Sequence, residues 1–216
     1  MEGSAVLTGI NSLSAFIQGG GVFMIVIFIV WGAGLAISVE RFLKLKSKDT
    51  DGPSFMNELQ RYVLSNDIQG AIRVCSGSIA ALPKVLKSGL KRANDSVQQI
   101  QNAIDATALE VIPKVEKRLN YLQMFANIST LFGLLGTIQG LIEAFAAVSA
   151  ADPQQKAEIL ALGISKAMNT TFLGLLAAIS LMMLHTFLSS KSEKIINEID
   201  EYSVKLIDLL GTKQEK

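Results

Sequence analysis

Two charged side chains fall inside long apolar stretches of the sequence. Glu143 lies in the stretch 122–148, and Lys166 lies in the next one, 159–190. A charge in the interior of a bilayer is costly, so such residues usually face a protein interior or a water-filled path. We therefore expect both side chains to belong to a site that membrane helices build together.

Threonines accompany both charges. Thr130 and Thr137 lie in the first stretch, and Thr170 and Thr171 lie in the second. A hydroxyl both donates and accepts, so it can hold a water or relay a proton while it stays neutral. For any single membrane threonine, a bond back to its own helix is the commoner arrangement. The threonines alone therefore leave both an ion path and plain packing open.

The spacing of these residues predicts two polar layers, if the two stretches are antiparallel helices joined by a short turn. Glu143 is six residues from Thr137, about 9 Å along a helix axis. Lys166 is five residues from Thr171, about 7.5 Å by the same rise. The two charges then share one depth and the two threonines share another.

Small residues interrupt the same two stretches. Gly136, Gly140 and Ala144 recur every fourth residue in the first stretch, with Gly133 just before them, and Gly174 lies in the second stretch. A ladder of small residues lets membrane helices approach closely. We therefore predict that these glycines pack one helix against the other.

The elements that position these residues are helices that cross a membrane. Half of the 216 residues are apolar, and three stretches have the length of a spanning helix. Trp31 lies in the middle of the first of these stretches, residues 22–40, which predicts a packing residue and not an interfacial anchor. We expect transmembrane helices over residues 22–40, 122–148 and 159–190, with a periplasmic turn over 149–158.

The remaining segments are polar or amphipathic. Residues 41–121 carry thirteen Lys and Arg among apolar residues at helical spacing, which predicts a helical domain. Its last helix has no turn signal before the second transmembrane stretch, so we expect one long helix that continues past Pro113. Amphipathic segments are expected over 1–21, lying on a membrane surface, and over 191–216, as a C-terminal helix.

The distribution of basic residues predicts the orientation. The first 21 residues contain no Lys or Arg, whereas residues 41–121 contain thirteen and the tail after residue 190 contains five. Basic loops stay on the cytoplasmic side of the inner membrane. We therefore expect a periplasmic N-terminus, a cytoplasmic domain over 41–121 and a cytoplasmic C-terminus.

Three motifs resemble one known family. LLGTIQG over 134–140 resembles the LLGTVxG signature of the second spanning helix in ExbB and TolQ proteins. GISKAMNTTFLGLLAAI over 163–179 resembles their third-helix pattern GIxEALxxTxxGLxxAI, and EKRLNYL over 116–122 resembles the lead-in to the second helix. With its three spans, the chain is similar to the ExbB/TolQ branch of the MotA/TolQ/ExbB proton-channel family.

The resemblance implies a homopentamer whose second and third helices surround a central pore. A dimer of a single-span, ExbD- or TolR-like partner would stand in that pore and supply the aspartate that carries the proton. Thr137 and Thr171 would line the ion path with Thr130 and Thr170. Ion flow would drive mechanical work on the cell envelope or outer-membrane transport, with a TonB- or TolA-like protein as a further partner.

The chain departs from the family pattern at one charged position. Lys166 stands where the third-helix pattern has a glutamate, and Glu143 supplies a carboxylate at matching depth. A relocated charge pair is one interpretation, and an entrance residue that tunes ion selectivity is the other. The choice between H⁺ and Na⁺ is therefore open.

Other function classes have less support in the sequence. Ser-His-Asp, Walker and Rossmann patterns are missing, so we expect no enzyme and no cofactor beyond the transported ion. The single His185 has no second ligand nearby in sequence, so we expect no metal site, and a net charge of +1 does not suggest a nucleic-acid partner. A non-conducting membrane scaffold remains the alternative function.

Overall fold

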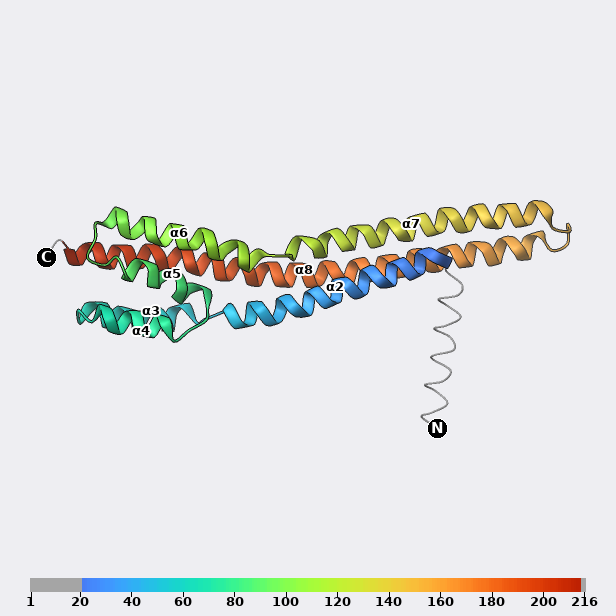
Figure 1. Ribbon diagram of the computed structural model, residues 1–216. Helices are drawn as coiled ribbons and strands as arrows, with labels where there is room; N and C mark the ends of the chain where they lie inside the picture. The colour runs from blue at the N-terminus through green and yellow to red at the C-terminus, as the bar shows by residue number, and fades with distance from the viewer. Residues whose placement is uncertain (1–20, 215–216) are drawn as a thin grey trace, which may run out of the picture. The chain divides into compact units, whose positions relative to one another are not determined.

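The computed structural model describes residues 21–214, all of whose regular elements are helices. The expected amphipathic segment over 1–21 lies outside this range except for Gly21. The helices are α2 (Gly21–Lys48), α3 (Gly52–Leu64), α4 (Ile68–Ser76), α5 (Ala81–Leu90), α6 (Val97–Glu116), α7 (Leu119–Ala150) and α8 (Lys156–Gln214), as shown in Figure 1.

Three of the helical stretches are long and apolar enough to cross a membrane. This confirms the prediction of an all-α protein with three long apolar helices. The described residues divide into two units, one formed by residues 21–38 and 120–185 and the other by 39–119 and 186–214. Helices α2 and α8 each contribute residues to both units.

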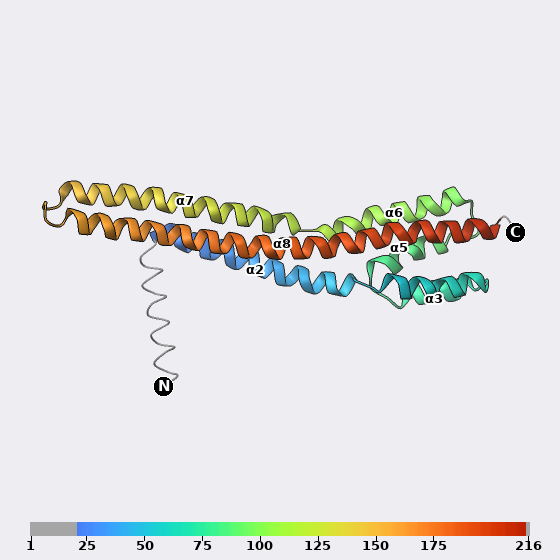
Figure 2. The ribbon, with the colours of Figure 1, turned by 180° about the vertical axis from the view of Figure 1, so that it is seen from behind.

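The first unit consists of the start of α2, nearly all of α7 and the first half of α8. Figures 1 and 2 both show α7 and this half of α8 side by side. Met24 and Ile27 of α2 are fully buried against Leu173 and Ala177 of α8. The indole Nε1 of Trp31 donates a hydrogen bond to Ser180 Oγ at 2.8 Å, in agreement with a packing role.

Large apolar side chains remain exposed on the helices of this unit. Ile142 is 64% exposed, Phe145 is 61% exposed and Phe172 is 63% exposed. Soluble monomers rarely expose contiguous apolar surface of this kind, and lipid or neighbouring subunits usually cover it. The first unit is therefore built for a membrane.

The second unit packs the end of α2 and helices α3 to α6 with the last part of α8. Each of these helices turns one apolar stripe inward, as the sequence period predicts. At the start of α4, Asp67 Oδ1 accepts a hydrogen bond from the Gly70 amide at 2.8 Å and caps the helix. The fully buried side chains of the second unit include Leu59, Val63, Val85, Leu86, Ile100, Val115, Ile199 and Leu206.

The prediction of one long helix from the second unit into α7 is wrong. Helix α6 continues through Pro113 but ends at Glu116, and α7 begins at Leu119. Between them, Arg118 adopts a φ of 66°, in the left-handed region that a helix cannot include. The break leaves the last carbonyls of α6 without intrahelical partners.

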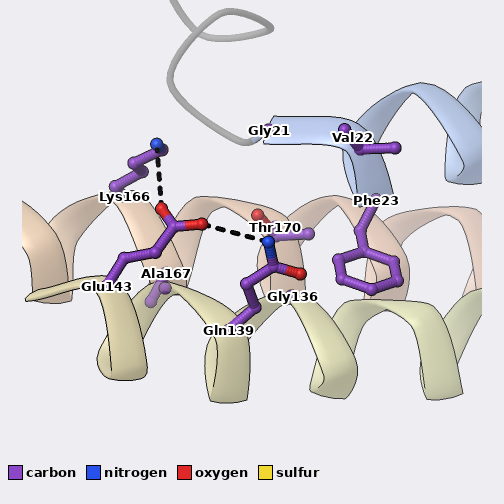
Figure 3. Close-up of a pocket in the computed structure, with 10 residues that line it drawn as sticks. Gly21, Val22, Phe23, Gly136, Gln139, Glu143, Lys166, Ala167 and Thr170 are labelled. Carbon is purple, nitrogen blue, oxygen red and sulfur yellow. Dashed lines mark hydrogen bonds and ion pairs between the residues drawn. The ribbon is translucent and has the colours of Figure 1, made fainter.

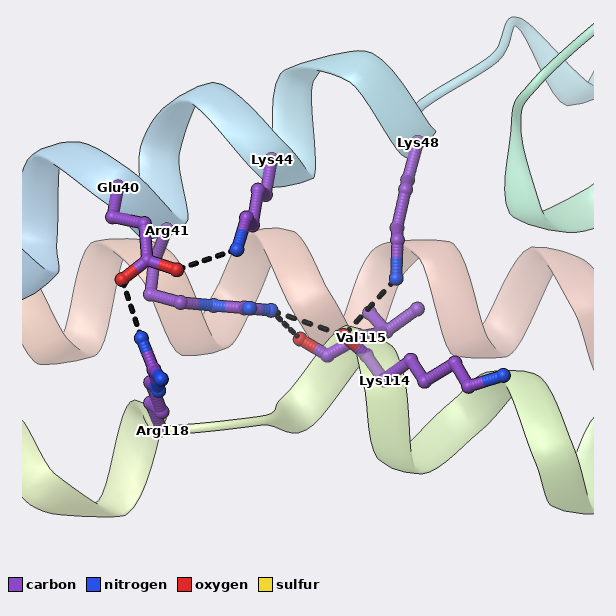
Figure 4. Close-up of polar contacts among 7 residues, drawn as sticks. All are labelled: Glu40, Arg41, Lys44, Lys48, Lys114, Val115 and Arg118. Carbon is purple, nitrogen blue, oxygen red and sulfur yellow. Dashed lines mark hydrogen bonds and ion pairs between the residues drawn. The ribbon is translucent and has the colours of Figure 1, made fainter.

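Side chains from α2 donate hydrogen bonds to two of these carbonyls, as Figure 4 shows. Arg41 Nη2 donates to Lys114 O at 3.1 Å and to Val115 O at 2.7 Å. Lys48 Nζ donates to Lys114 O at 3.0 Å. On the other side of the break, Arg118 Nη1 lies 2.7 Å from Glu40 Oε2. Partners more than sixty residues away in sequence therefore stabilise the break.

The turn between α7 and α8 is shorter than expected, since it spans residues 151–155 and not 149–158. Helix α8 then runs for 59 residues without interruption. The composition changes near residue 190 from apolar to amphipathic, but the chain there contains no glycine or proline to end the helix.

Candidate functional site

The candidate site begins with the close contact between α7 and α8. A Cβ added at Gly133 would lie 3.3 Å from the Cα atoms of Gly174 and Thr171. A Cβ added at Gly174 would lie 2.7 Å from Ser129 O and 2.9 Å from Gly133 Cα. These distances are to backbone atoms, so the two helices approach closely only because both positions lack a side chain.

The contact continues toward the turn as a ladder of small residues. Gly136 faces Thr170, whose Cβ would lie 2.8 Å from an added Cβ. Gly140 faces Ala167 at the same distance of 2.8 Å, and one turn further Ala144 faces Gly163. We call these four levels, with Gly133 and Gly174 as the first, the small-residue ladder.

The ladder fixes the depth of the polar residues. Thr137 adjoins Gly136, at the level of Thr170 and Thr171, and Glu143 adjoins Ala144, near the level of Gly163 and Lys166. The contacts therefore agree with the two layers counted from the helical rise.

The threonines of α8 face α7. Thr171 Oγ1 donates a hydrogen bond to Gly133 O at 2.8 Å, which joins the two helices directly. Thr170 is 1% exposed and packs against Gly136. The carbonyl of Gly133 can accept this hydrogen bond in addition to the one within its helix, because Gly133 has no side chain to cover it.

The threonines of α7 bond within their own helix. Thr137 Oγ1 donates to Leu134 O at 2.6 Å, and Thr130 Oγ1 donates to Ala126 O at 3.2 Å. Thr130 is exposed and Thr137 is half-buried. Each hydroxyl oxygen still has lone pairs that can accept a hydrogen bond from water.

The structure brings Glu143 and Lys166 together, as Figure 3 shows. Lys166 Nζ lies 3.6 Å from Glu143 Oε2, and Gln139 Nε2 donates to Glu143 Oε1 at 3.0 Å. The side chains of Lys166 and Glu143 are 43% and 53% exposed. The pair is thus formed within one chain but stays accessible to water, lipid or another subunit.

Gln139 is a member of this site that our sequence reasoning missed. Its position four residues before Glu143 is the spacing at which helical side chains meet, so the signal was present. Gln139 and Glu143 line a hollow of about 20 Å³ together with Thr170, Lys166 and residues 21–23 at the start of α2. A hollow of this size holds about one water molecule, and the lining offers it polar partners.

The arrangement brings charged and hydroxyl groups close together inside an apolar helix pair. It can hold a water, exchange hydrogen bonds with it, and attract or repel an ion at one end of α7 and α8. Within residues 21–214, no group of three His, Cys, Asp or Glu side chains could hold a metal ion.

Comparisons with known proteins show the family of the chain. The signature of the MotA/TolQ/ExbB proton channel family matches residues 78–201, which include α5, α6, α7 and most of α8. A protein of Methanothermobacter thermautotrophicus, described as a biopolymer transport protein ExbB homologue, is 23% identical over 197 residues, which are 90% of this chain and 69% of that protein. The Tol-Pal system protein TolQ of Haemophilus influenzae is 32% identical over 125 residues, which are 54% of each protein.

A solved structure has the same fold. The structure of C. jejuni MotAB aligns with a TM-score of 0.67 and covers 98% of this chain and 90% of the matched chain, at 15% sequence identity. At that identity the likeness concerns the fold alone. The signature covers more than half of the chain, and it includes both helices that carry the polar residues. The chain is therefore a membrane protein that belongs to the MotA/TolQ/ExbB proton channel family.

Proposed function

We propose that this chain is the pore-forming subunit of an ion-driven, energy-transducing complex of the inner membrane, of the ExbB/TolQ type. The observation that carries the proposal is the family signature across α7 and α8, two apolar helices that carry hydroxyls and charges at matched depths. Five copies would surround a central pore, and proton flow through it would drive work on the cell envelope or outer-membrane transport.

A second kind of subunit completes the proposed complex. The relatives carry the names ExbB and TolQ, and the similar solved structure, MotAB, is by its name a complex of two kinds of protein. We propose a dimer of an ExbD- or TolR-like protein in the pore, which would act on a TonB- or TolA-like protein. Its membrane carboxylate would carry the proton, since Glu143 of this chain is held in an ion pair.

Thr137 and Thr171 are the proposed ion-path residues, assisted by Thr130 and Thr170. Thr137 supports this role because its hydroxyl donates only to its own helix and its oxygen can accept from a pore water. Thr171 donates to α7 and would set the position of that helix as well as accept from water.

The test is proton flux into liposomes that contain the whole complex, purified from its native membrane. Thr137→Val keeps the shape, removes the hydroxyl and should abolish most of the flux without loss of assembly. Thr171→Val should also cost about 0.6 kcal/mol of helix association, the average for such bonds in membranes. The matched control is Thr107→Val, since Thr107 Oγ1 donates to Ala103 O of α6, outside the channel helices.

A non-conducting scaffold is the second candidate function. It is favoured by one observation, which is that Thr130, Thr137 and Thr171 all donate to backbone carbonyls. Unchanged flux in the double variant Thr137→Val/Thr171→Val, at normal protein levels, would favour the scaffold and exclude the ion path. Flux that follows a Na⁺ gradient and not a pH gradient would replace the proton by Na⁺.

The proposed orientation has a periplasmic N-terminus and a cytoplasmic C-terminus. It is supported by the basic residues of 41–121 and of the tail after residue 190. A cysteine introduced in the turn, Ala151→Cys, should react with an impermeant maleimide in intact spheroplasts. Lys91→Cys should react only after lysis, and the reverse pattern would invert the orientation.

A further inference from the structure

A cluster of basic side chains lies where the uncharged run of α2 ends. Arg41, Lys44 and Lys48 lie along one side of α2. In Figure 4 Arg41 and Lys48 point toward the end of α6, and Lys44 points toward Glu40. Lys84 and Lys114 also act electrostatically on Lys48. We call these five residues and Arg118 the basic cluster.

Carboxylates neutralise only part of the basic cluster. Glu40 pairs with Lys44 at 2.5 Å and with Arg118 at 2.7 Å. Glu110 pairs with Lys114 at 2.5 Å and with Lys84 at 3.1 Å. Two carboxylates therefore face six cations, which leaves the cluster with a clear excess of positive charge.

Arg41 and Lys48 are the members of the basic cluster that form no ion pair among the described residues, although Glu40 also acts electrostatically on Arg41. Among residues 21–214, no carboxylate lies within 4.0 Å of either side chain. Arg41 Nη2 and Lys48 Nζ instead share one acceptor, Lys114 O, at 3.1 Å and 3.0 Å. Two cations are thus held against one carbonyl, although like charges repel.

Arg41 has a donor that remains unused. The side chain is only 2% exposed, and its Nε is buried with no hydrogen-bond partner among the described residues. Buried cations are usually paired with an anion, because an unpaired charge is costly away from water. The cluster therefore combines a buried cation, an excess of positive charge and, on Lys44 and Lys48, two amines one helical turn apart.

We propose that the basic cluster binds the phosphate group of an anionic membrane lipid, such as phosphatidylglycerol. The location favours a lipid over a free phosphate, because residues 22–39 of the same helix are uncharged and Arg41 follows them within two residues. Basic residues directly after a membrane helix attract anionic headgroups. Lys44 and Lys48 would contact the phosphate. The buried charge of Arg41 would add to the positive electrostatic potential at that position.

Binding can be measured by native mass spectrometry of the full-length protein in neutral detergent with equal amounts of phosphatidylglycerol and phosphatidylcholine. We expect a preference for retained phosphatidylglycerol in the unchanged protein. Lys48→Gln and Lys44→Gln should each reduce that preference about fivefold, the value of one basic residue near an anionic surface. Thermal unfolding of each variant checks that the fold is intact.

Lys46→Gln is the matched control. Lys46 lies between the two amines in sequence, is exposed, and points to a different side of α2 because residues two apart do not share a helix face. It should leave the preference within about twofold. An equal effect of all three variants would show that any surface lysine contributes equally to lipid binding, and it would overturn the proposed site.

A final experiment distinguishes a lipid phosphate from free inorganic phosphate as the ligand. Inorganic phosphate in excess should leave bound phosphatidylglycerol in place and should not raise the unfolding temperature. If it displaces the lipid and stabilises the protein equally well, the site takes free phosphate and the lipid assignment is wrong. Neither result depends on ion conduction, so the proposed function is tested separately.

Discussion

At the scale of the residue, Glu143 and Lys166 form an ion pair that is neither buried nor fully solvated. Removing one partner of a buried pair costs about 3–5 kcal/mol, whereas an exposed pair contributes about 0.2–1 kcal/mol. Side chains that are 53% and 43% exposed belong nearer the second case. Gln139 holds the same carboxylate from the other side and would retain part of its position.

We predict that Glu143→Gln and Lys166→Met each weaken assembly or flux, and that the double variant recovers part of the loss. The coupling free energy should be about 0.5–1 kcal/mol, because the pair is half exposed. A double-mutant cycle on denaturant unfolding in detergent measures it. Simple additivity would contradict the pair, and the alternative role of Lys166 as a selectivity residue would then be tested by Lys166→Glu.

Cys75 is a second residue whose surroundings decide its chemistry. It is 2% exposed, and burial raises the pKa of its thiol to about 12 from 9.0. The folded state therefore holds the thiol proton more tightly than the unfolded state. The contribution of this thiol to stability is complete below pH 9.0 and is lost as the pH rises toward about 12.

We predict that iodoacetamide does not modify Cys75 at pH 8 in the native protein, because the thiolate is the reacting form. Full modification should appear in denaturant, and mass spectrometry of the intact chain measures both. Rapid modification under native conditions would show that the helices around α4 open locally. The same inertness makes the native chain a clean background for introduced cysteines.

At the scale of the element, the small-residue ladder determines how closely α7 and α8 pack. At the first level the closest atoms belong to the backbone, since a Cβ at Gly174 would lie 2.7 Å from the backbone oxygen of Ser129. Backbone atoms cannot rotate away as a side chain can, so the helices themselves must separate.

We predict that Gly174→Ala lowers the free energy of unfolding by about 1–3 kcal/mol, the usual range for overpacking. Gly32→Ala is the matched control, because Gly32 also lies in a membrane helix but an added Cβ there meets nothing within 4 Å. It should be neutral or stabilise by up to about 1 kcal/mol through helix propensity. Unfolding in mixed detergent micelles compares the two, and equal effects would contradict the ladder.

The existence of the long helices could be predicted from the sequence, whereas the break between α6 and α7 could not. Residues 22–39 are uncharged for the length of a bilayer, so α2 follows from composition alone. The depth of Glu143 and Lys166 follows from the constant rise of a helix. The break at Lys117 and Arg118 depends on Arg41 and Glu40, which are distant in sequence, and no local residue signals it.

The directions in which the threonine side chains point could not be predicted from the sequence either. Thr137 and Thr171 have the same chemistry, yet one donates to its own helix and the other donates across to Gly133. That difference depends on which face of α8 meets the ladder, and hydropathy carries little information on this when both faces are apolar. The ion path along these residues stays a prediction.

At the scale of the whole molecule, the exposed apolar surface and the half-exposed ion pair both call for further subunits. We predict that the purified protein forms a pentamer in mild detergent, because neighbouring subunits would enclose the exposed part of Glu143 and Lys166 in a water-filled path and keep it from lipid, where a charge is costly. Native mass spectrometry counts the subunits. A spectrum dominated by monomers or dimers would contradict the pentamer, and the Gly174→Ala variant shows whether assembly needs the tight helix pair.

The small-residue ladder also sets a rule for how this protein can change during evolution. Gly140 faces Ala167, and Ala144 faces Gly163, so each of these two levels holds a single methyl group. In one level α8 supplies the methyl, and in the other α7 supplies it. The fold therefore specifies the combined volume at each level and not the residue on either helix. Two substitutions that move a methyl from one helix to its partner would be tolerated together, while each alone would leave either a gap or a clash.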